Sequence, residues 1–369
     1  MKKLIALVLA VVMCLGMFAG CASTADKTPA AEKVPAADSG NAPATEAAEY
    51  VSGESSLKGK RVRVVIGSTS TGGDSYMIAD MVTRYLGEEM GFNGKVDAVG
   101  NAAALDAITK AKGDGTTIMM FHDMAYLSVL FGSVGPEYAL ENLTVGPQIG
   151  SNPGGCFAAN AAKPYSSMKE AAEWLQANPN ETIHVNIEAG AASHLCFGVF
   201  YMWAKETYGD DVASRIKAIV GGTTDEKKQR LWDGNADIIY ADYSSLVEYT
   251  KEGVDPQLAV KVFDTCGEVE GVSSMADSGM TFNGEVFTFN KDFFMFFPKD
   301  MDEGILSEIN AAMMKVAANP DFQAEMARMT YTAVSPENTD MAVARDYIYS
   351  KRDNAVAIVD QCPSLDDLT

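Results

Sequence analysis

Short apolar strands alternate with amphipathic helices along most of this chain, and this alternation is the feature that most restricts its fold. Residues 61–66 are rich in β-branched side chains and lead into a glycine-rich turn, after which apolar residues recur at helical spacing. Similar apolar runs predict further strands at residues 95–99, 116–121, 182–187, 216–220, 237–240 and 257–263. Because repeated strand-helix units pack as a sheet covered by helices, the pattern predicts an α/β protein with mainly parallel sheets.

Two of the expected helices carry a capping box, in which a Ser or Thr side chain and a Glu three residues later satisfy free backbone N–H groups. Ser167 with Glu170 has this spacing, and so does Thr223 with Glu226. We therefore expect helices to begin at these two positions.

The loops that follow the expected strands are rich in glycine, serine and alanine. In a parallel sheet such loops meet at one edge, where each leads into a helix N-terminus and where ligands bind. Small residues let backbone N–H groups approach an anion closely, although tight turns have the same composition. The loops are residues 68–75, 99–102, 121–123, 188–193, 221–224 and 241–244.

The first 21 residues have the pattern of an export signal that ends in a lipidation site. Lys2 and Lys3 precede an apolar run, and the small pair Ala19 and Gly20 lies directly before Cys21. This order predicts cleavage before Cys21 and attachment of acyl chains, and multiple chains anchor a protein stably. An ordinary cleaved signal and an uncleaved membrane helix are the alternatives, but the run is marginal for spanning. We expect an extracytoplasmic protein that is lipid-anchored to the cell membrane.

Composition divides the rest of the chain in two. Residues 22–56 contain almost no large apolar side chains, so they predict a disordered tether. About 310 residues remain, which suits two domains of typical size. The net charge of −21 argues against nucleic acid as a partner. It does not exclude an anionic ligand, because backbone N–H groups set the local field of a pocket.

Four cysteines remain once Cys14 leaves with the signal and Cys21 takes lipid. Cys156, Cys196, Cys266 and Cys362 match no zinc or redox spacing. In an exported protein they are either disulfides or buried small apolar residues, and the sequence leaves both open. We expect no metal and no cofactor.

Several short motifs occur in the same order as in one family of receptors. They are Gly72-Gly73-Asp74-Ser75 after the first strand, Asp114-Gly115, Gly190 to Leu195, Gly234 with Asp237, and Asn319-Pro320. From about Lys60 onward the chain thereby resembles the substrate-binding receptors of tripartite tricarboxylate transporters, the Bug-type extracytoplasmic solute receptors. The order and spacing of the motifs carry the resemblance more than any single motif does.

The chain departs from the family pattern in loops that would contact a ligand. Tyr76 replaces an Asp after the first loop, and Ala191 replaces a Ser after Gly190. The family's Phe-Asp pair after the central strand falls on Tyr240 and Ala241, with an Asp one place later. The backbone cradle is therefore expected to persist, whereas a tricarboxylate ligand does not follow from the resemblance.

The resemblance implies a two-lobed fold of the periplasmic-binding-protein type (type II), with the ligand in the cleft between the lobes. We expect lobe 1 at residues 57–148 and 266–369, and lobe 2 at residues 149–265. The implied function is to capture a small carboxylated solute and deliver it to the integral membrane permease subunits of a tripartite transporter.

The loops and the resemblance together give a set of expected ligand-binding residues. Backbone N–H groups would hold the ligand carboxylate from both lobes. The residues are Ser70, Thr71, Gly72, Gly73, Asp74, Ser75, Tyr76, Gly100, Asn101, His122, Asp123, Gly190, Ala191, Ala192, Ser193, Gly222, Thr223 and Asp242.

Two other functions compete with transport. An enzyme would use Ser193 and His194, or His122 and Asp123, but adjacent residues on a helix do not face one another and no catalytic signature is present. A lipoprotein of the same fold that senses a ligand or serves as a scaffold for a membrane partner is the second alternative. We expect no catalytic activity.

Overall fold

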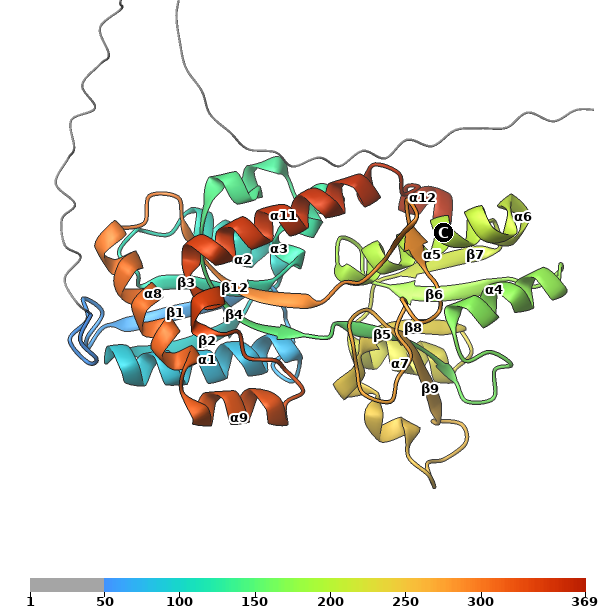
Figure 1. The fold of residues 1–369 in the computed structure, drawn as a ribbon, viewed down its shortest axis with the longest axis horizontal. Helices are drawn as coiled ribbons and strands as arrows, with labels where there is room; N and C mark the ends of the chain where they lie inside the picture. The colour runs from blue at the N-terminus through green and yellow to red at the C-terminus, as the bar shows by residue number, and fades with distance from the viewer. Residues whose placement is uncertain (1–49) are drawn as a thin grey trace, which may run out of the picture. The chain divides into compact units, whose positions relative to one another are not determined.

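The computed structural model describes residues 50–369, which contain two five-stranded sheets (Figure 1). We call each sheet with its helices a lobe. The first lobe's sheet has, in spatial order, β2 (Asn93–Ala98), β1 (Arg61–Ile66), β3 (Thr117–His122), β12 (Lys291–Pro298) and β4 (Leu143–Asn152). The second lobe's sheet has β7 (Ile216–Val220), β6 (Ile183–Ile187), β8 (Ile238–Asp242), β5 (Gly155–Asn160) and β9 (Val260–Thr265).

Both sheets are mixed, so the expectation of mainly parallel sheets holds for only half of the strand pairs. In the first lobe β1 is parallel to β2 and β3, whereas β12 is antiparallel to β3 and β4. In the second lobe β6 is parallel to β7 and β8, whereas β5 is antiparallel to β8 and β9. The sequence patterns found every parallel strand within two residues at each end, and β9 within three. They missed β4, β5 and β12, whose partners in the sheets are antiparallel and distant along the chain.

The chain crosses between the two sheets twice. It passes from the end of β4 to the start of β5 through only two residues, and it returns from β9 to β12 through residues 266–290. The return segment contains the small hairpin of β10 (Thr281–Phe282) and β11 (Glu285–Val286). The expected limits of the lobes at residues 148 and 265 stay predictions, and β4 continues in the first sheet to Asn152.

Helices cover both sheets. The first lobe has α1 (Asp74–Met90), α2 (Asn101–Thr109), α3 (Met124–Leu130), η1 (Pro136–Tyr138), η2 (Leu140–Asn142), α8 (Glu303–Ala317), α9 (Pro320–Arg328), α10 (Pro336–Thr339) and α11 (Met341–Val359). The second has α4 (Met168–Ala177), α5 (Ala192–Tyr208), α6 (Asp210–Ala213), α7 (Thr224–Trp232), η3 (Tyr243–Ser245), η4 (Val247–Thr250) and α12 (Leu365–Leu368). Helix α11 also packs against α5, and α12 packs against β7, so the C-terminal residues contact both lobes.

The core of the first lobe is built around β12, which lies between β3 and β4. All eight of its residues are buried, and Phe293, Phe294, Phe296 and Phe297 are almost fully enclosed. A strand with neighbours on both sides and helices on both faces reads as a continuous apolar run, without alternation. The four phenylalanines of β12 therefore belong to the core of the first lobe.

Local sequence signals explain several helix starts and turns. The Ser167 side chain accepts a hydrogen bond from the Glu170 N–H, and Thr223 with Glu226 forms a complete capping box, which confirms both expected starts. Asn319 caps α9 with Pro320 in its first turn. The Asp114 carboxylate accepts hydrogen bonds from the Thr116 N–H and hydroxyl group. The family motifs at residues 114–115 and 319–320 are thus structural.

Residues 50–56 pack against the first lobe, although composition placed them in the tether. The Tyr50 hydroxyl donates to the Glu89 carbonyl at 3.0 Å, and the Ser55 hydroxyl donates to the Met90 carbonyl at 2.7 Å. Ser55 is buried by these contacts. Residues 50–56 therefore belong to the first lobe. The signal, the lipidation site Cys21 and the rest of the tether lie outside the described residues, and no helix within residues 50–369 is long and apolar enough to cross a membrane.

The four remaining cysteines are free thiols in this structure. Cys156, Cys196 and Cys266 are buried, and Cys362 is partly buried. The sulfur atoms of Cys196 and Cys266 lie 2.9 Å apart, so α5 and the segment after β9 place two thiols in direct contact.

Candidate ligand-binding site

A cavity of about 770 Å³ lies between the lobes, at the loops that follow β1, β2 and β3 in the first lobe and β6, β7 and β8 in the second. The residues that precede four helices line it: Gly73 before α1, Gly100 before α2, Ala191 before α5 and Thr223 before α7. The first N–H groups of a helix have no partner within the helix and carry a partial positive charge. Two helix N-termini from each lobe thus give the cavity a set of backbone donors for an anion.

Two glycines of these loops have backbone conformations that other residues adopt only with strain. Gly100 has φ 89° and ψ 159°, and it lines the cavity at the start of α2. Gly190 has φ 71°, and a Cβ atom there would lie 2.5 Å from the Ser133 hydroxyl oxygen. Gly190 therefore shapes the loop before α5 by its packing, and it does not line the cavity itself.

Most of the residues expected to bind ligand line this cavity. They are Ser70, Gly72, Gly73, Asp74, Ser75, Gly100, Asn101, His122, Ala191, Ala192, Ser193, Gly222, Thr223 and Asp242. Thr71, Tyr76, Asp123 and Gly190 do not. Thr71 is exposed in its loop, and Tyr76 packs against the apolar core of the first lobe, because the turn of α1 points it away from the cavity.

Asp123 belongs to a buried ion-pair network instead of the cavity. Its carboxylate lies 2.8 Å from the Lys351 ammonium group and accepts hydrogen bonds from the Tyr126 hydroxyl and the Asp292 N–H. Lys351 also contacts the Asp292 carboxylate at 2.6 Å. Burial and the repulsion from Asp292 raise the pKa of Asp123 in spite of Lys351. The network joins α3, β12 and α11, so Asp123 has a structural role.

His122 lines the cavity as a neutral imidazole. Burial, followed by repulsion from Lys291, lowers its pKa to about 3. Its Nδ1 atom accepts a hydrogen bond from the Met124 N–H at 3.2 Å, which leaves the ring proton on Nε2. The ring packs against Phe121 and Phe293. His122 therefore contributes no charge to the cavity near neutral pH.

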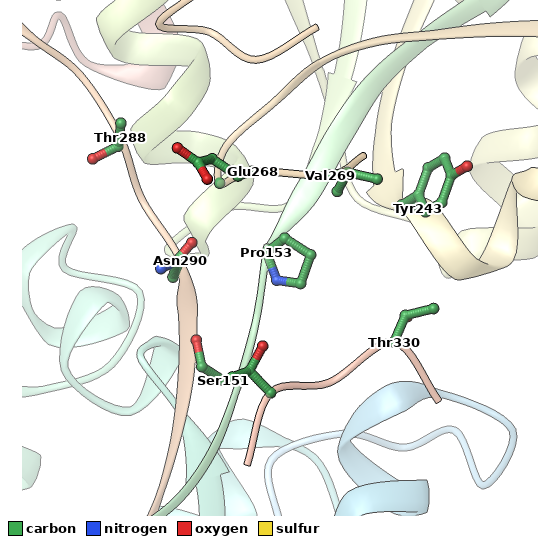
Figure 2. A pocket seen from close by; sticks show the side chains of 10 residues that line it. Ser151, Pro153, Tyr243, Glu268, Val269, Thr288, Asn290 and Thr330 are labelled. Atoms are coloured by element: carbon green, nitrogen blue, oxygen red, sulfur yellow. The ribbon is translucent and has the colours of Figure 1, made fainter. Parts of the chain in front are cut away.

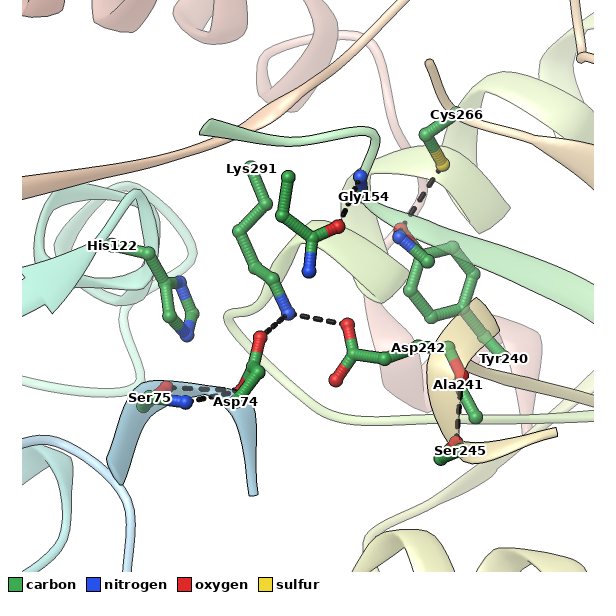
Figure 3. A network of polar contacts seen from close by, with 12 residues as sticks. Asp74, Ser75, His122, Gly154, Tyr240, Ala241, Asp242, Ser245, Cys266 and Lys291 are labelled. Atoms are coloured by element: carbon green, nitrogen blue, oxygen red, sulfur yellow. Dashed lines mark hydrogen bonds and ion pairs between the residues drawn. The ribbon is translucent and has the colours of Figure 1, made fainter. Parts of the chain in front are cut away.

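A lysine shared by two carboxylates lies in the cavity wall (Figure 3). Lys291, the first residue of β12, forms ion pairs with Asp74 at the start of α1 and with Asp242 at the end of β8. Asp74 also accepts hydrogen bonds from the N–H and hydroxyl groups of Ser75. The two aspartates come from different lobes, so Lys291 connects the lobes across the cavity.

The three charged groups perturb one another. Burial opposes the ionisation of Asp74, but attraction to Lys291 holds its pKa below the usual range. Burial and the repulsion from Asp74 raise the pKa of Asp242, in spite of Lys291. The two carboxylates overcome burial and raise the pKa of Lys291. Lys291 therefore stays charged, and of the two aspartates Asp242 takes up a proton more readily.

Six charged residues line the cavity but are absent from the expected ligand-binding set: Glu188, Asp225, Glu226, Lys227, Lys228 and Lys291. Lys227 on α7 is buried, donates to the Tyr240 carbonyl at 3.3 Å and has a pKa lowered by burial. Glu188 is exposed at the start of the loop before α5. The one signal in the sequence for Lys291 is a pair of charged residues, Lys291 and Asp292, directly before an apolar run.

Ser193 and His194 hold their loop together and do not form a nucleophile-base pair. The Ser193 hydroxyl accepts a hydrogen bond from the Glu188 N–H at 2.9 Å. The His194 Nδ1 atom accepts one from the Gly190 N–H at 3.3 Å, and the ring stacks on Phe131. Burial lowers the pKa of His194 to about 4. Within residues 50–369, no group of three His, Cys, Asp or Glu side chains is placed to hold a metal ion.

A second cavity of about 540 Å³ lies where the chain crosses between the sheets (Figure 2). Glu268 is the one charged residue among those that line it, and the others include Ser151, Thr288 and Asn290. A cavity that is lined by a carboxylate and by no lysine or arginine does not suit an anionic solute. The residues expected to bind ligand all lie elsewhere.

Two mixed sheets, joined by two crossings and enclosing a cavity of backbone donors, define a two-lobed solute-binding protein of the periplasmic type. Residues 76–359 match the family described as tripartite tricarboxylate transporter family receptor. The chain belongs to this family, which confirms the resemblance seen in the sequence and makes the protein a solute receptor and not an enzyme. Among curated proteins, none matches the chain in sequence.

Solved structures share the fold. The MatC protein of Rhodopseudomonas palustris with bound malate is 17% identical, with a TM-score of 0.64 over 81% of this chain and 99% of that one. The periplasmic binding protein BugD is 17% identical, with a TM-score of 0.61 over 82% and 97% of the two chains. A second Rhodopseudomonas palustris protein, with adipate, is 13% identical, with a TM-score of 0.59 over 82% and 98%. At these identities the likeness establishes the architecture alone.

Proposed function

We propose that this chain is an extracytoplasmic receptor, anchored by lipid at Cys21, that captures a small carboxylated solute and delivers it to the membrane permease subunits of a tripartite transporter. The observation that carries the proposal is the set of four helix N-termini that line one cavity, two from each lobe. Such N–H groups bind a carboxylate without an arginine. The malate and adipate complexes of proteins with this fold support a carboxylated solute.

The test of the solute class begins with the full chain purified in detergent. Mass spectrometry of what denaturation releases should find a carboxylated compound, and calorimetry should then show that the compound binds again. A receptor returns its ligand unaltered and is stabilised by it, so the melting temperature should rise with ligand concentration. A product that accumulates with time would instead support an enzyme.

Gly73→Val tests the position of the carboxylate. Gly73 has φ −91° and ψ 166°, which valine adopts freely, and a Cβ atom there has its nearest neighbour, the Ser70 hydroxyl oxygen, at 3.6 Å. The added side chain would cover the N–H groups at the start of α1, so affinity should fall at least tenfold, about 1.4 kcal/mol. Thr71→Val in the same loop is the control, because Thr71 does not line the cavity. Unchanged affinity of Gly73→Val would place the ligand elsewhere.

Closure of the two lobes is part of the proposal. We keep lobe 1 as residues 57–148 and 266–369 and lobe 2 as residues 149–265, and we expect ligand to draw them together. Solution scattering should show a smaller radius of gyration with ligand than without it. An equal radius in both states would contradict closure.

The lipid anchor rests on the sequence alone. Cys21→Ser removes the thiol that would take the acyl chains, so the variant should move from the membrane fraction to the soluble fraction. A variant that stays with membranes as firmly as the parent protein would show that another segment anchors it.

A further inference from the structure

We propose that Cys196 and Cys266 form a disulfide bond in the exported protein, and that this bond ties the start of the second crossing between the sheets to α5. The bond goes beyond the proposed function and uses one part of it, the extracytoplasmic location. Disulfide bonds form and persist in such oxidising compartments. The sequence leaves the state of these cysteines open, and the fold brings two of them together.

The sulfur atoms of Cys196 and Cys266 lie closer together than two unbonded sulfur atoms normally pack. They are 2.9 Å apart, so a shift of about 0.9 Å would bring them to the disulfide bond length of about 2.05 Å. Both side chains are completely buried, Cys196 on α5 and Cys266 directly after β9. The Cys266 sulfur also contacts the Tyr240 hydroxyl at 3.0 Å (Figure 3), and this hydroxyl can donate to a disulfide sulfur as well as to a thiol.

A metal ion does not explain the contact between the two thiols. The Met275 thioether lies 3.9 Å from the Cys266 sulfur, and thiolate and thioether sulfur atoms are ligands for soft metal ions. Two thiolates on one tetrahedral zinc ion lie about 3.8 Å apart, because each Zn–S bond is about 2.3 Å long. At 2.9 Å, Cys196 and Cys266 are too close to hold an ion between them.

The other two cysteines do not compete for this bond. The Cys156 thiol donates a hydrogen bond to the Ala241 carbonyl at 3.4 Å, and Cys362 is partly buried elsewhere on the surface of α5. Within residues 50–369, the contact of Cys196 with Cys266 is the one hydrogen-bond-range contact between two thiols. The fold therefore selects a single pair.

The backbone of Cys266 is hydrogen-bonded to both crossings between the sheets. Its N–H donates to the carbonyl of Gly155, where the first crossing ends, and its carbonyl accepts from the N–H of Phe289, near the end of the second crossing. Cys196 lies one turn after the residues of α5 that line the solute cavity. The bond would therefore hold this wall of the cavity against the crossings while the lobes move.

The bond forms by thiol–disulfide exchange with an oxidant that is itself a disulfide, such as oxidised glutathione. One cysteine thiolate attacks the oxidant and releases a first thiol, and the other cysteine then attacks the mixed disulfide and releases a second. Cys196 and Cys266 together lose two protons and two electrons, and the oxidant becomes two thiols. Burial raises the pKa of the Cys196 thiol, so the exchange takes place before α5 packs against the crossing.

Peptide mapping of the full chain, exported and purified in detergent, tests the bond. The protein is unfolded with maleimide present, which blocks free thiols, and is digested with trypsin, which cleaves at a lysine or arginine between each neighbouring pair of these cysteines. We expect maleimide on Cys156 and Cys362, and we expect the peptides that carry Cys196 and Cys266 to stay joined until dithiothreitol separates them. Maleimide on all four cysteines, or any other pairing, would overturn the proposal. Neither result depends on a ligand, so the proposed solute binding would stand.

The melting temperature tests whether the bond ties the fold together. The two cysteines are 70 residues apart, and opening a loop of this length with dithiothreitol should lower the melting temperature of the parent protein by at least about 3 °C. Cys196→Ala cannot form the bond and should melt at the same temperature with and without dithiothreitol. Cys156→Ala is the matched control, because it removes an equally buried thiol outside the pair and should keep the parent's response. Equal responses of the parent and of Cys196→Ala would overturn the role of the bond as a tie.

Discussion

Replacing Lys351 with Met should destabilise the protein strongly, because it removes the cation that two buried carboxylates share. Asp123 is fully buried and Asp292 is 2% exposed, and Lys351 contacts both. Removing one partner of a buried ion pair costs about 3–5 kcal/mol. In the variant, the Tyr126 hydroxyl and the Asp292 N–H still donate to Asp123, and the Tyr347 hydroxyl still donates to Asp292. We therefore expect the free energy of unfolding to fall by the lower value of this range, about 3 kcal/mol.

The pH dependence of the stability lost in Lys351→Met identifies the buried carboxylates as its cause. The pKa of Asp123 is already raised in the folded protein, and loss of Lys351 raises it further. A folded-state carboxyl pKa above the unfolded value costs stability while the pH is above it, and the cost disappears as the pH falls through it. Urea unfolding followed by circular dichroism should therefore show that the free energy of unfolding of Lys351→Met lies closer to that of the parent protein at pH 5 than at pH 7.

The control is Lys110→Met, since Lys110 pairs with Asp106 on the surface and is 75% exposed. Exposed pairs of this kind contribute little to stability, so Lys110→Met should leave the free energy of unfolding close to that of the parent protein. A deficit below about 1 kcal/mol for Lys351→Met at pH 7, or a deficit that grows on acidification, would refute the description of this network as a buried charge cluster.

Two further predictions follow from buried groups. The folded-state pKa of His122, about 3, lies below its ordinary value of 6.5, so the stability contributed by the neutral ring is present above pH 6.5 and is lost as the pH falls. When the pH falls from 6.5 to 5, the free energy of unfolding measured with urea should decrease by about 2 kcal/mol more in the parent protein than in His122→Asn. Equal decreases in the two proteins would contradict the lowered pKa of His122. Diamide, a thiol oxidant, should take two hydrogens from Cys196 and Cys266 and join them, whereas Cys156 should still react with maleimide after unfolding. Loss of Cys156 labelling instead would contradict the observed contact.

Local patterns predicted the parallel strands and the helix starts, because the information lies within a few neighbouring residues. The helix starts after Ser167 and Thr223 are examples, since four residues determine each. The strands β4, β5 and β12 were missed for the opposite reason. Their partners and directions depend on where the chain crosses between the sheets, and no local spacing records that crossing.

The residues of the site also fall into those that local sequence predicts and those that depend on the tertiary fold. A carboxylate after a buried strand, such as Asp123, looks the same in sequence whether it faces a cavity or a lysine 228 residues away on α11. Lys291 is separated from Asp74 by more than half the chain, so its pairing became visible only in the fold. The loops that line the cavity were found because their small residues are adjacent in sequence.

Recognition in this receptor therefore has two parts that the sequence encodes differently. The proposed carboxylate cradle consists of backbone N–H groups at helix N-termini, and any sequence that forms the same strand-loop-helix units reproduces these donors. The charge balance depends on side chains such as Asp242 and Lys291, which meet only through the tertiary fold and can change one at a time. At 17% identity the comparison establishes the fold alone, so the side chains of the cavity have to be read from this chain itself. The backbone donors therefore support the proposed carboxylate, whereas the side chains of the cavity determine which other groups a ligand can carry.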